Sequence, residues 1–310
     1  MVELVCISLA SMTPAPIPKE TIVCLGNFDG VHLAHRALLQ QATSLQKLAL
    51  PNAARCVFSF FEPSWTALSH RREKVLSTQQ ERLEHFRDQA IEYAILCDFT
   101  AIREYSPERF AKEILLEGCH CVGAVCGFNY RFGKFGAGTP EQLQTLLKRP
   151  VTVQNEVVLL GETVSSTRIR SLLAQGDVKI AAALLGEAYS ISGPIVHGKA
   201  LGKQIGFPTI NQELPANKAV PRNGVYLTEC RIDGTCYYGV TNIGTRPTVE
   251  TGTVPNCETH LLGVCEDFYG KHATVSFLEF LRPEQKFASL EALCSQLKQD
   301  VATAQSLLNS

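Results

Sequence analysis

The first 185 residues alternate short apolar runs of β-forming residues with longer amphipathic stretches, and this alternation constrains the fold more than any other feature of the chain. The expected strands are TIVCL (21–25), RCVFSF (55–60), YAILC (93–97), CVGAVCG (121–127) and VTVQNEVVLL (151–160). The expected helices span 36–49, 77–90 and 166–186, the last with a break near Gly176 and a cap at Gly186. Strands separated by helices of this length pair in parallel through crossover connections, so the pattern predicts a doubly wound α/β domain.

The composition and hydrophobic pattern of the sequence change after Gly186. Glycine and proline become frequent there, and short β-like runs replace helical periods. These runs are YSISGPIVHG (189–198), NGVYLTEC (223–230), CYYGVTNIG (236–244) and HATVSFLEF (272–280). Only residues 289–308 return to a helical period. The second half is therefore expected to be an antiparallel barrel or sandwich with a C-terminal helix, and the predicted domains are 1–186 and 187–310.

Charge and hydropathy exclude several classes of partner. The formal net charge is −1 with no block of like charges, which argues against nucleic acid or an acidic membrane as a partner. No run of 18 apolar residues is present, so no transmembrane helix is expected. The N-terminal stretch carries Glu3 and then three closely spaced prolines, which suits an edge strand and an extended connector better than an export signal. No feature indicates an oligomeric state.

The 12 cysteines show no CxxC spacing, and most lie inside apolar runs. A free thiol in such a run behaves as a small hydrophobe, so a reduced, cytoplasmic protein is expected. The group Cys119, His120, Cys121 and Cys126 leaves zinc binding open as the alternative to buried thiols, although its spacing matches no common zinc finger.

The stretch GNFDGVHLAH (26–35) follows the apolar run 21–25 and places two histidines at the expected start of a helix. Gly30 can adopt a backbone conformation that other residues avoid, as a tight turn requires. A helix that starts near Val31 or His32 presents unpaired backbone N–H groups, which favour anions. His32 and His35, spaced i and i+3, share one helix face and could donate to phosphate oxygens. The alternative is a pair of histidines on a solvated face.

A second stretch, VSSTRIRSLL (164–173), places hydroxyl residues and two arginines at another helix start. Cations there oppose the helix dipole at a cost of about 0.3–1 kcal/mol each, which a bound anion would offset. The alternative is an ordinary N-cap with solvated arginines.

Together these motifs resemble the GxFDGxHxGH and SSTxIR motifs of the α/β nucleotidyltransferases. The segment CGFNYRFGKFGAG (126–138) resembles the flavin-side segment of one branch, the prokaryotic bifunctional riboflavin kinase/FAD synthetases, whose second domain is a barrel-like kinase. The resemblance covers almost the whole chain. It implies a Rossmann-like nucleotidyltransferase domain followed by an antiparallel β-barrel kinase domain, with riboflavin, FMN, FAD and ATP as substrates or products and Mg²⁺ as cofactor.

In the family reaction the FMN phosphate attacks the α-phosphorus of ATP and pyrophosphate leaves. The resemblance implies that the ATP phosphates are held by His32, His35, Ser166, Thr167 and Arg170. It implies that the nucleotide pocket is shaped by Gly26, Asn27, Phe28 and Asp29. It implies that the flavin is faced by Asn129 and Arg131. The chain departs from the family at Ala34, where glycine is usual, and at Ser64 and Trp65, where FFEPSW replaces a common FEPHP.

The stretch GPIVHGKALGKQIGFPTIN (193–211) is rich in glycine and ends in PTIN, which resembles the PTAN motif of riboflavin kinases. Thr209 and Asn211 alternate along an extended chain and offer the neutral oxygens that magnesium accepts beside nucleotide phosphates. The expected ATP-binding residues are Gly198, Lys203 and Gly206. A glycine-rich hairpin without a ligand is the alternative.

Further motifs follow in the family's order: NGVY (223–226), GVTNIGTRPTV (239–249) and ETHLL (258–262). By resemblance, Glu258 accepts the proton from the terminal hydroxyl of riboflavin. Arg282, in LRPEQKF (281–287), would close a flavin or nucleotide site, and a plain turn before the last helix is the alternative. Two other functions stay open: a riboflavin kinase whose adenylyltransferase site is weakened or altered, and a flavin-binding protein without turnover.

Overall fold

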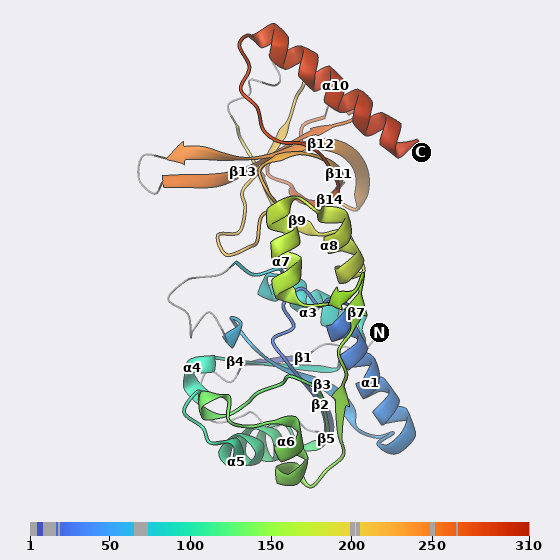
Figure 1. Ribbon diagram of the computed structural model, residues 1–310, viewed down its shortest axis with the longest axis vertical. Coiled ribbons are helices and arrows are strands. Elements are labelled where there is room, and N and C mark those ends of the chain that lie inside the picture. The colour runs from blue at the N-terminus through green and yellow to red at the C-terminus, as the bar shows by residue number, and fades with distance from the viewer. Residues whose placement is uncertain are drawn as a thin grey trace. The chain divides into compact units, whose positions relative to one another are not determined.

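The computed structural model describes residues 5–8, 17, 19–64, 74–198, 202, 205–248, 252–264 and 266–309. The chain forms two compact units, Met1–Ser166 and Thr167–Ser310 (Figure 1). The predicted domain boundary lies later, after residue 186, so nearly all of the helical stretch predicted over 166–186 belongs to the second compact unit. Among the described helices, none combines the length and apolarity needed to cross a membrane.

The first unit is an α/β domain. Its elements are β1 (Val5–Ser8), β2 (Thr21–Leu25), α1 (Leu33–Ala49), β3 (Ala54–Phe60), α3 (Gln79–Asp88), β4 (Tyr93–Cys97), α4 (Phe99–Ile102), α5 (Pro107–Arg109), the π-helical η1 (Phe110–Gly118), β5 (Cys121–Gly127), η2 (Lys134–Gly136), α6 (Pro140–Leu147), β6 (Val151–Gln154), β7 (Val158–Leu159) and β8 (Glu162–Thr163). Six strands pair in parallel in the order β1-β4-β3-β2-β5-β6, as the alternating sequence predicts.

The single strand predicted over 151–160 is wrong, because the chain leaves the sheet after β6. The polar residues Asn155 and Glu156 separate β6 from β7, and β7 pairs with β8 in a small antiparallel hairpin. Leu160 and Gly161 have φ angles of 54° and 77°, which suit the tight turn of such a hairpin.

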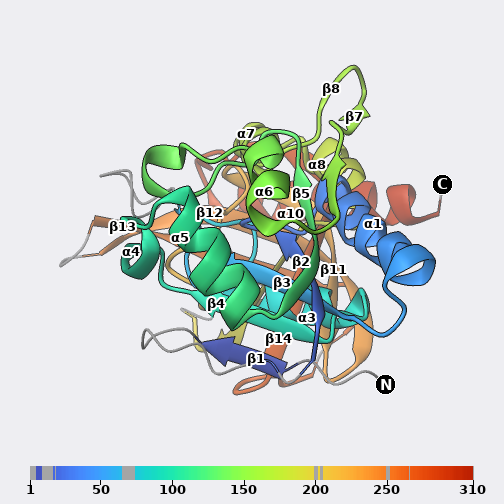
Figure 2. The same cartoon turned by 90° about the horizontal axis from the view of Figure 1, so that it is seen from below.

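Both faces of the parallel sheet are covered, which explains why its strands are nearly continuous apolar runs (Figure 2). One face packs on α1 and α3 through Leu38, Leu39 and Phe86. The other packs on η1 and α6 through Leu115 and Leu143. Successive residues of each strand point to opposite faces, so Val23 and Cys24 contribute to different cores.

The strand order also fixes where a ligand is expected to bind. From β2 the chain moves to β3 and β4 on one side, and it later returns to place β5 and β6 on the other side. Leu25, the last residue of β2, is paired with Cys126 of β5. The segments that leave these two strands therefore flank a topological switch point, where open α/β sheets bind their ligands.

The second unit is a closed antiparallel barrel with flanking helices. Its elements are α7 (Ser166–Gln175), α8 (Val178–Leu185), β9 (Ser190–Val196), β10 (Ile210–Gln212), β11 (Gly224–Ile232), β12 (Thr235–Thr248), β13 (Gly252–Leu261), β14 (His272–Arg282) and α10 (Leu290–Leu308). The barrel closes in the order β10-β13-β12-β11-β14-β9. This confirms a barrel and excludes the sandwich alternative.

The predicted break near Gly176 is confirmed between α7 and α8, and Gly186 ends α8 in the left-handed conformation with φ of 82°. Inside the barrel, buried hydroxyls bond across three strands, from Thr228 to Thr241 (2.7 Å) and from Thr241 to Thr259 (2.8 Å). Helix α10 packs on the barrel through an apolar face that includes Ala304.

Candidate active sites

The turn after β2 has an unusual backbone. Gly30 has a φ of 81°, and two non-glycine residues nearby also have positive φ, Phe28 at 51° and Val31 at 38°. Phe28 is fully buried and packs edge-on against Phe86, with ring centroids 5.5 Å apart. Positive φ at residues with a side chain is strained, and such strain concentrates at functional sites. A Cβ on Gly26 would lie 3.2 Å from the Phe28 ring, so a side chain there would press on the packing that holds the turn.

Asn27 and Asp29 tie this turn to its neighbours. The Asn27 carbonyl accepts from the Ser59 hydroxyl at 3.1 Å, and its Oδ1 accepts from the backbone N–H and hydroxyl of Ser64 at 3.2 and 3.3 Å. Asp29 is 1% exposed, and its Oδ1 accepts from the N–H groups of Leu76 and Ser77 at 2.8 and 3.1 Å. These side chains therefore hold the frame of the turn.

His32 and His35 form a stacked pair at the start of α1, with ring centroids 3.8 Å apart. His32 is the N-cap, and its Nδ1 accepts from the backbone N–H of His35 at 3.4 Å. Burial lowers the pKa of His32 to about 4. Burial, and secondarily the adjacent His32, holds the pKa of His35 well below its usual value. Both rings are therefore neutral at pH 7, and the His32 tautomer that accepts at Nδ1 carries its proton on Nε2.

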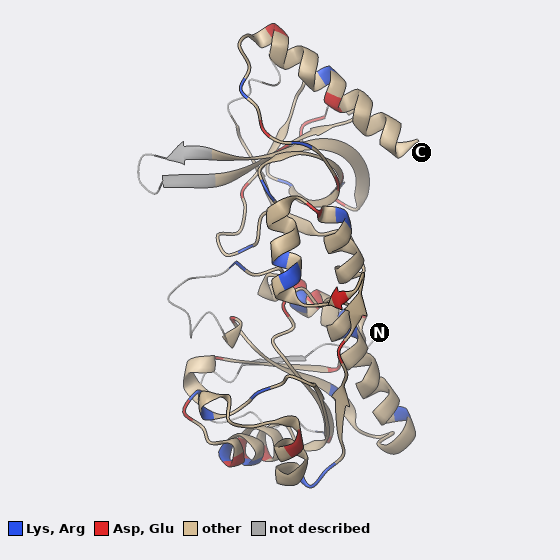
Figure 3. Ribbon diagram, viewed as in Figure 1, with Lys and Arg blue, Asp and Glu red and all other residues tan. Residues whose placement is uncertain are grey.

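Helix α7 begins at Ser166, whose hydroxyl donates to the Asp29 carbonyl at 2.8 Å. The next predicted phosphate ligands lie on the same helix, and Arg170 Nη2 donates to Thr167 Oγ1 at 3.4 Å. The first turns of α7 carry two arginines and no acidic residue (Figure 3). The helix N-terminus is thus basic, as the sequence pattern indicates.

The predicted flavin-side residues follow β5, on the other side of the switch point from the turn after β2. Asn129 and Arg131 are exposed, and Arg131 Nη1 donates to the Tyr130 carbonyl at 3.0 Å. Two further aromatic residues of this segment are exposed, Phe128 at 47% and Phe135 at 93%. The sequence prediction did not include them, although aromatic residues in a glycine-rich loop are a usable signal for ring stacking.

The cysteine group near β5 consists of buried thiols. Cys119, Cys121 and Cys126 lie in the core between the sheet and its helices. Burial raises the pKa of Cys121 and Cys126 to about 12, so these thiols are protonated. The part of the chain that the structure describes contains no cluster of three or more potential metal ligands of the His, Cys, Asp or Glu type. The geometry favours the buried-thiol interpretation over zinc.

Two of the departures from the family pattern, Ala34 and Ser64, lie near the same turn. Ser64 contacts Asn27, as given above, and Trp65 lies outside the described residues. Ala34 is half-buried in the first turn of α1. A residue that the sequence prediction missed, Arg82 on α3, donates to the Asn27 carbonyl at 3.1 Å.

The second unit contains a cavity of about 260 Å³. Three of the predicted kinase residues, Thr209, Glu258 and Arg282, line it. Its apolar wall is formed by Ile205, Phe207, Val225, Val240, Phe287, Leu293, Leu297 and Val301. Its remaining polar lining is formed by Asn242, His260, Glu284, Gln285 and Asp300. A partly open cavity with an apolar wall and convergent polar groups is typical of a small-molecule site.

Strand pairing brings Glu258 together with two asparagines, Asn211 of β10 and Asn242 of β12. Asn256 Nδ2 donates to Glu258 Oε1 at 2.9 Å. Asn211 is 5% exposed, and a Cβ on Gly198 would overlap its side-chain amide. A side chain at residue 198 would therefore force the buried Asn211 side chain to shift.

The other predicted ATP-binding residues are less informative. Lys203 lies outside the described residues. Gly206 has a φ of 83° and therefore adopts the left-handed conformation that favours glycine. A residue that the prediction missed, His260, has its Nδ1 2.8 Å from the Pro208 carbonyl, so Nδ1 is the donor and the ring holds the residue that precedes Thr209.

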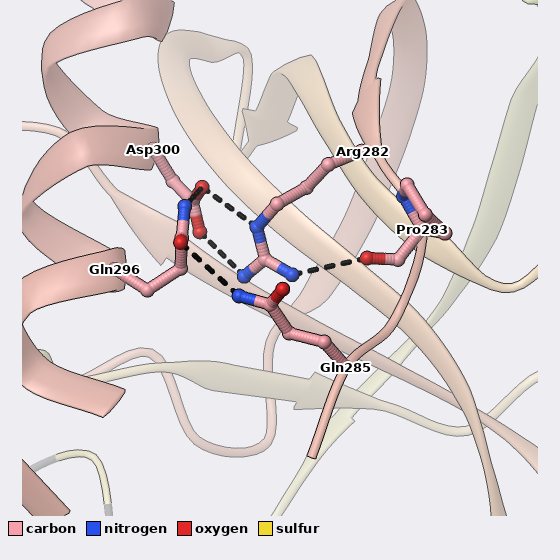
Figure 4. A network of polar contacts seen from close by, with 5 residues as sticks. All are labelled: Arg282, Pro283, Gln285, Gln296 and Asp300. Atoms are coloured by element: carbon pink, nitrogen blue, oxygen red, sulfur yellow. Dashed lines mark hydrogen bonds and ion pairs between the residues drawn. The ribbon is translucent and has the colours of Figure 1, made fainter. Parts of the chain in front are cut away.

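Arg282 is held by a polar network between the end of β14 and α10 (Figure 4). Its Nε and Nη2 donate to the two carboxylate oxygens of Asp300 at 2.8 and 2.7 Å, and its Nη1 donates to the Pro283 carbonyl at 3.1 Å. Gln296 also donates to Asp300 at 3.0 Å and accepts from Gln285 at 3.1 Å. The network fixes α10 as one wall of the cavity. Asp300 was missed because no local pattern distinguishes it from the other polar residues of the helix.

Comparison with known proteins finds a matching family for each half of the chain. Residues 15–168 match the family model for FAD synthetase, and residues 185–308 match that for riboflavin kinase. The bifunctional riboflavin kinase/FMN adenylyltransferase of Pseudomonas fluorescens is 35% identical over 302 residues, which are 94% of each chain. The protein of the same name from Escherichia coli K12 is 34% identical over 93% of each chain. That from Listeria monocytogenes is 30% identical over 90% of each chain.

A solved structure named as a macrolide-efflux protein from Streptococcus pneumoniae has the same overall fold. Its TM-score is 0.90 at 28% identity, and the match covers 97% of this chain and 98% of that chain. The structural likeness extends to both units of this chain. The name describes the Streptococcus pneumoniae protein only.

Proposed function

The chain belongs to the family of bifunctional riboflavin kinases/FMN adenylyltransferases, and from that premise we propose which of its residues carry out each reaction. The enzyme phosphorylates riboflavin to FMN with ATP, and it adenylylates FMN to FAD with release of pyrophosphate. We assign adenylyl transfer to residues 1–186 and riboflavin phosphorylation to residues 187–310.

For adenylyl transfer, an oxygen of the FMN phosphate attacks the α-phosphorus of ATP and the bond to pyrophosphate breaks. The negative charge that develops on the leaving group needs fixed hydrogen-bond donors more than it needs acid–base chemistry. The stacked, neutral pair His32 and His35 supplies ring N–H donors without the cost of burying two cations, since both pKa values are lowered. The N-terminal N–H groups of α1 add to this anion site.

The hydroxyl of Ser166 has a single proton, which it gives to the Asp29 carbonyl. We therefore propose that Ser166 serves ATP through its backbone N–H, while its hydroxyl stays bonded to the Asp29 carbonyl. Thr167 and Arg170 stay predicted phosphate ligands. On the other side of the switch point, we assign the flavin to Asn129 and Arg131, with the exposed Phe128 ring available for stacking.

For riboflavin phosphorylation, we propose that the flavin ring occupies the apolar part of the barrel cavity and that Glu258 accepts the proton of its terminal hydroxyl. The carboxylate takes this proton late in a loose transition state, and such general-base help contributes about 10²–10⁴ in rate. The amide of Asn256 bonds to Glu258 Oε1 and orients the carboxylate.

The residues at the start of β10 suit magnesium. Thr209 Oγ1 and Asn211 Oδ1 are hard, neutral oxygens, and the backbone at Gly198 passes close to the Asn211 amide. Mg²⁺ takes few protein ligands when phosphates and water supply the rest, and when bound it neutralises charge on the ATP phosphates. His260 holds the chain before Thr209 through the Pro208 carbonyl.

The observation that carries the proposal is that Thr209, Glu258 and Arg282, chosen from separate motifs, line one cavity. The test incubates the pure protein with riboflavin, ATP and magnesium and follows the flavins by chromatography. We expect FMN first and then FAD. FMN without FAD would leave the N-terminal assignment without support, and the absence of both products would overturn the whole proposal.

Ser64 favours one variant of this function, because it stands where the family usually has histidine and contacts Asn27 of the proposed nucleotide pocket. A separate assay of FMN with ATP, CTP and GTP tests whether the adenylyl site is weakened or prefers another nucleotide. Efficient, ATP-specific FAD synthesis would remove that variant. The proposed partners are the small-molecule substrates, and the proposed location is the cytoplasm, where buried thiols such as Cys56 stay reduced.

A further inference from the structure

Arg82 is a buried cation outside every motif that the sequence singles out. It lies on α3, is 2% exposed, and its pKa is lowered by burial, an effect that the Asp29 carboxylate partly offsets. Its Nη1 donates to the Asn27 carbonyl at 3.1 Å and to the Ser59 hydroxyl at 3.3 Å. Its Nη2 donates to the carbonyls of Phe60 and Phe61 at 2.8 and 2.7 Å.

These four acceptors lie at the carboxyl ends of β2 and β3, which are neighbouring parallel strands. Ligands of open α/β sheets bind at this edge. The backbone pairing of β2 with β3 ends at Leu25 and Phe58. Beyond this point, the planar guanidinium of Arg82 joins the segments that leave the two strands. A lysine could not reproduce this pattern, because its ammonium group is a single point donor on a flexible stem.

Asn27 is fixed from two directions by this arrangement. Its carbonyl is held by Arg82 and Ser59, and its side-chain oxygen is held by Ser64. Phe28, the next residue, has the strained φ of 51° that the turn requires. A group that holds the Asn27 carbonyl therefore also holds the strained peptide plane that leads to the histidine pair.

A role in stability alone does not account for a charge at this position. The acceptors that the described residues offer the guanidinium are three carbonyls and one hydroxyl, and the charge of the nearby Asp29 carboxylate offsets the cost of desolvation only in part. Well-packed apolar residues often replace buried charged groups without loss of stability. What an apolar residue cannot do is hold several carbonyl groups in a fixed geometry.

We propose that Arg82 is a positioning residue of the adenylyltransferase site, which holds the turn Gly26–Gly30 in the geometry that binds ATP. This inference rests on the proposed function. Because Arg82 bridges β2 and β3, whereas the proposed flavin segment follows β5 on the opposite side of β2, the effect falls on ATP more than on FMN.

The test compares the full-length wild-type protein with Arg82→Gln and Arg82→Lys. Arg87→Gln is the matched control, since Arg87 is an exposed arginine on the same helix. FMN adenylylation is measured with supplied FMN at varied ATP and then at varied FMN, and riboflavin phosphorylation is measured on the same samples. The folded fraction of each sample comes from far-UV circular dichroism, and the kinase rate shows only whether the second unit is intact.

For Arg82→Gln we expect the KM for ATP to rise about tenfold or more, because a hydrogen-bonded charged group is lost from the frame of the site. The KM for FMN is expected to change less than threefold, and Arg82→Lys to recover only part of the ATP affinity. Riboflavin phosphorylation and the Arg87→Gln variant are expected to match the wild type.

An unchanged KM for ATP in folded Arg82→Gln, with only the folded fraction reduced, would make Arg82 a purely structural residue and overturn the inference. Full recovery by Arg82→Lys would also overturn it, since charge and not the fork would then suffice. If Arg82→Gln does not fold, the KM for ATP of Arg82→Lys decides by the same criterion. Failure of the wild type to form FAD would instead defeat the proposed function, and this inference with it.

Discussion

The ion pair between Arg282 and Asp300 provides the sharpest test of how the barrel cavity is built. The side chains are 17% and 4% exposed, and two hydrogen bonds of 2.8 and 2.7 Å join them. We consider Asp300→Leu, which leaves the guanidinium of Arg282 without its carboxylate. Removing one partner of a buried pair costs about 3–5 kcal/mol, because the remaining charge stays desolvated and unpaired.

The loss should be visible as a lower melting temperature of the barrel. For a unit of this size, 1 kcal/mol corresponds to a shift of about 2–4 °C, so the single variant should melt about 6–20 °C below the wild type. Thermal unfolding followed by circular dichroism measures this. Because the two units need not unfold together, the barrel transition is identified as the one that riboflavin raises.

The double variant Arg282→Met/Asp300→Leu separates the unpaired charge from lost packing. Replacing both members with apolar groups of similar volume is often neutral, so the double variant should recover most of the lost stability. A single variant that melts within about 2 °C of the wild type would refute the reasoning. So would a double variant that is no more stable than the single one, since the unpaired charge could not then be the cause.

The remaining predictions concern the chemistry and pH response of each unit. Glu258→Gln should slow riboflavin phosphorylation by about 10²–10⁴ while supplied FMN is still converted to FAD, and a kinase rate near that of the wild type would contradict the role of Glu258 as base. His35→Ala should slow the conversion of FMN to FAD while riboflavin is still phosphorylated. Loss of both activities in a folded protein would contradict two separate sites. The pKa of His32 falls from 6.5 in the unfolded chain to about 4 in the fold, so the unfolded state binds more protons between these values. The contribution of His32 to the free energy of unfolding should therefore be fully present above pH 6.5 and fall by about 3 kcal/mol as the pH drops toward 4. Urea unfolding of the first unit at pH 7 and pH 4.5 measures this fall, and His32→Asn, which keeps an N-cap acceptor, should reduce it; an equal fall in that variant would assign the effect to other groups.

Much of the local structure could be predicted from the sequence. The strands predicted at 21–25, 93–97 and 121–127 have these bounds in the structure, and the helix break at Gly176 is present. Hydrophobic periodicity is a local property, so the residues of a strand or helix are themselves enough to predict it. The prediction was wrong over 151–160, where the apolar pattern continues but two polar residues end the pairing with the sheet.

The sequence by itself determined the elements, the change from α/β to barrel, and the motifs that carry the family resemblance. Only the tertiary structure decided that Arg82 holds Asn27, 55 residues away, or that Asp300 neutralises Arg282. The physical reason is that hydrogen bonds of this kind join residues that are distant along the chain. The pattern of neighbouring residues specifies which way each segment folds, but the packing of several segments decides which polar groups are buried together.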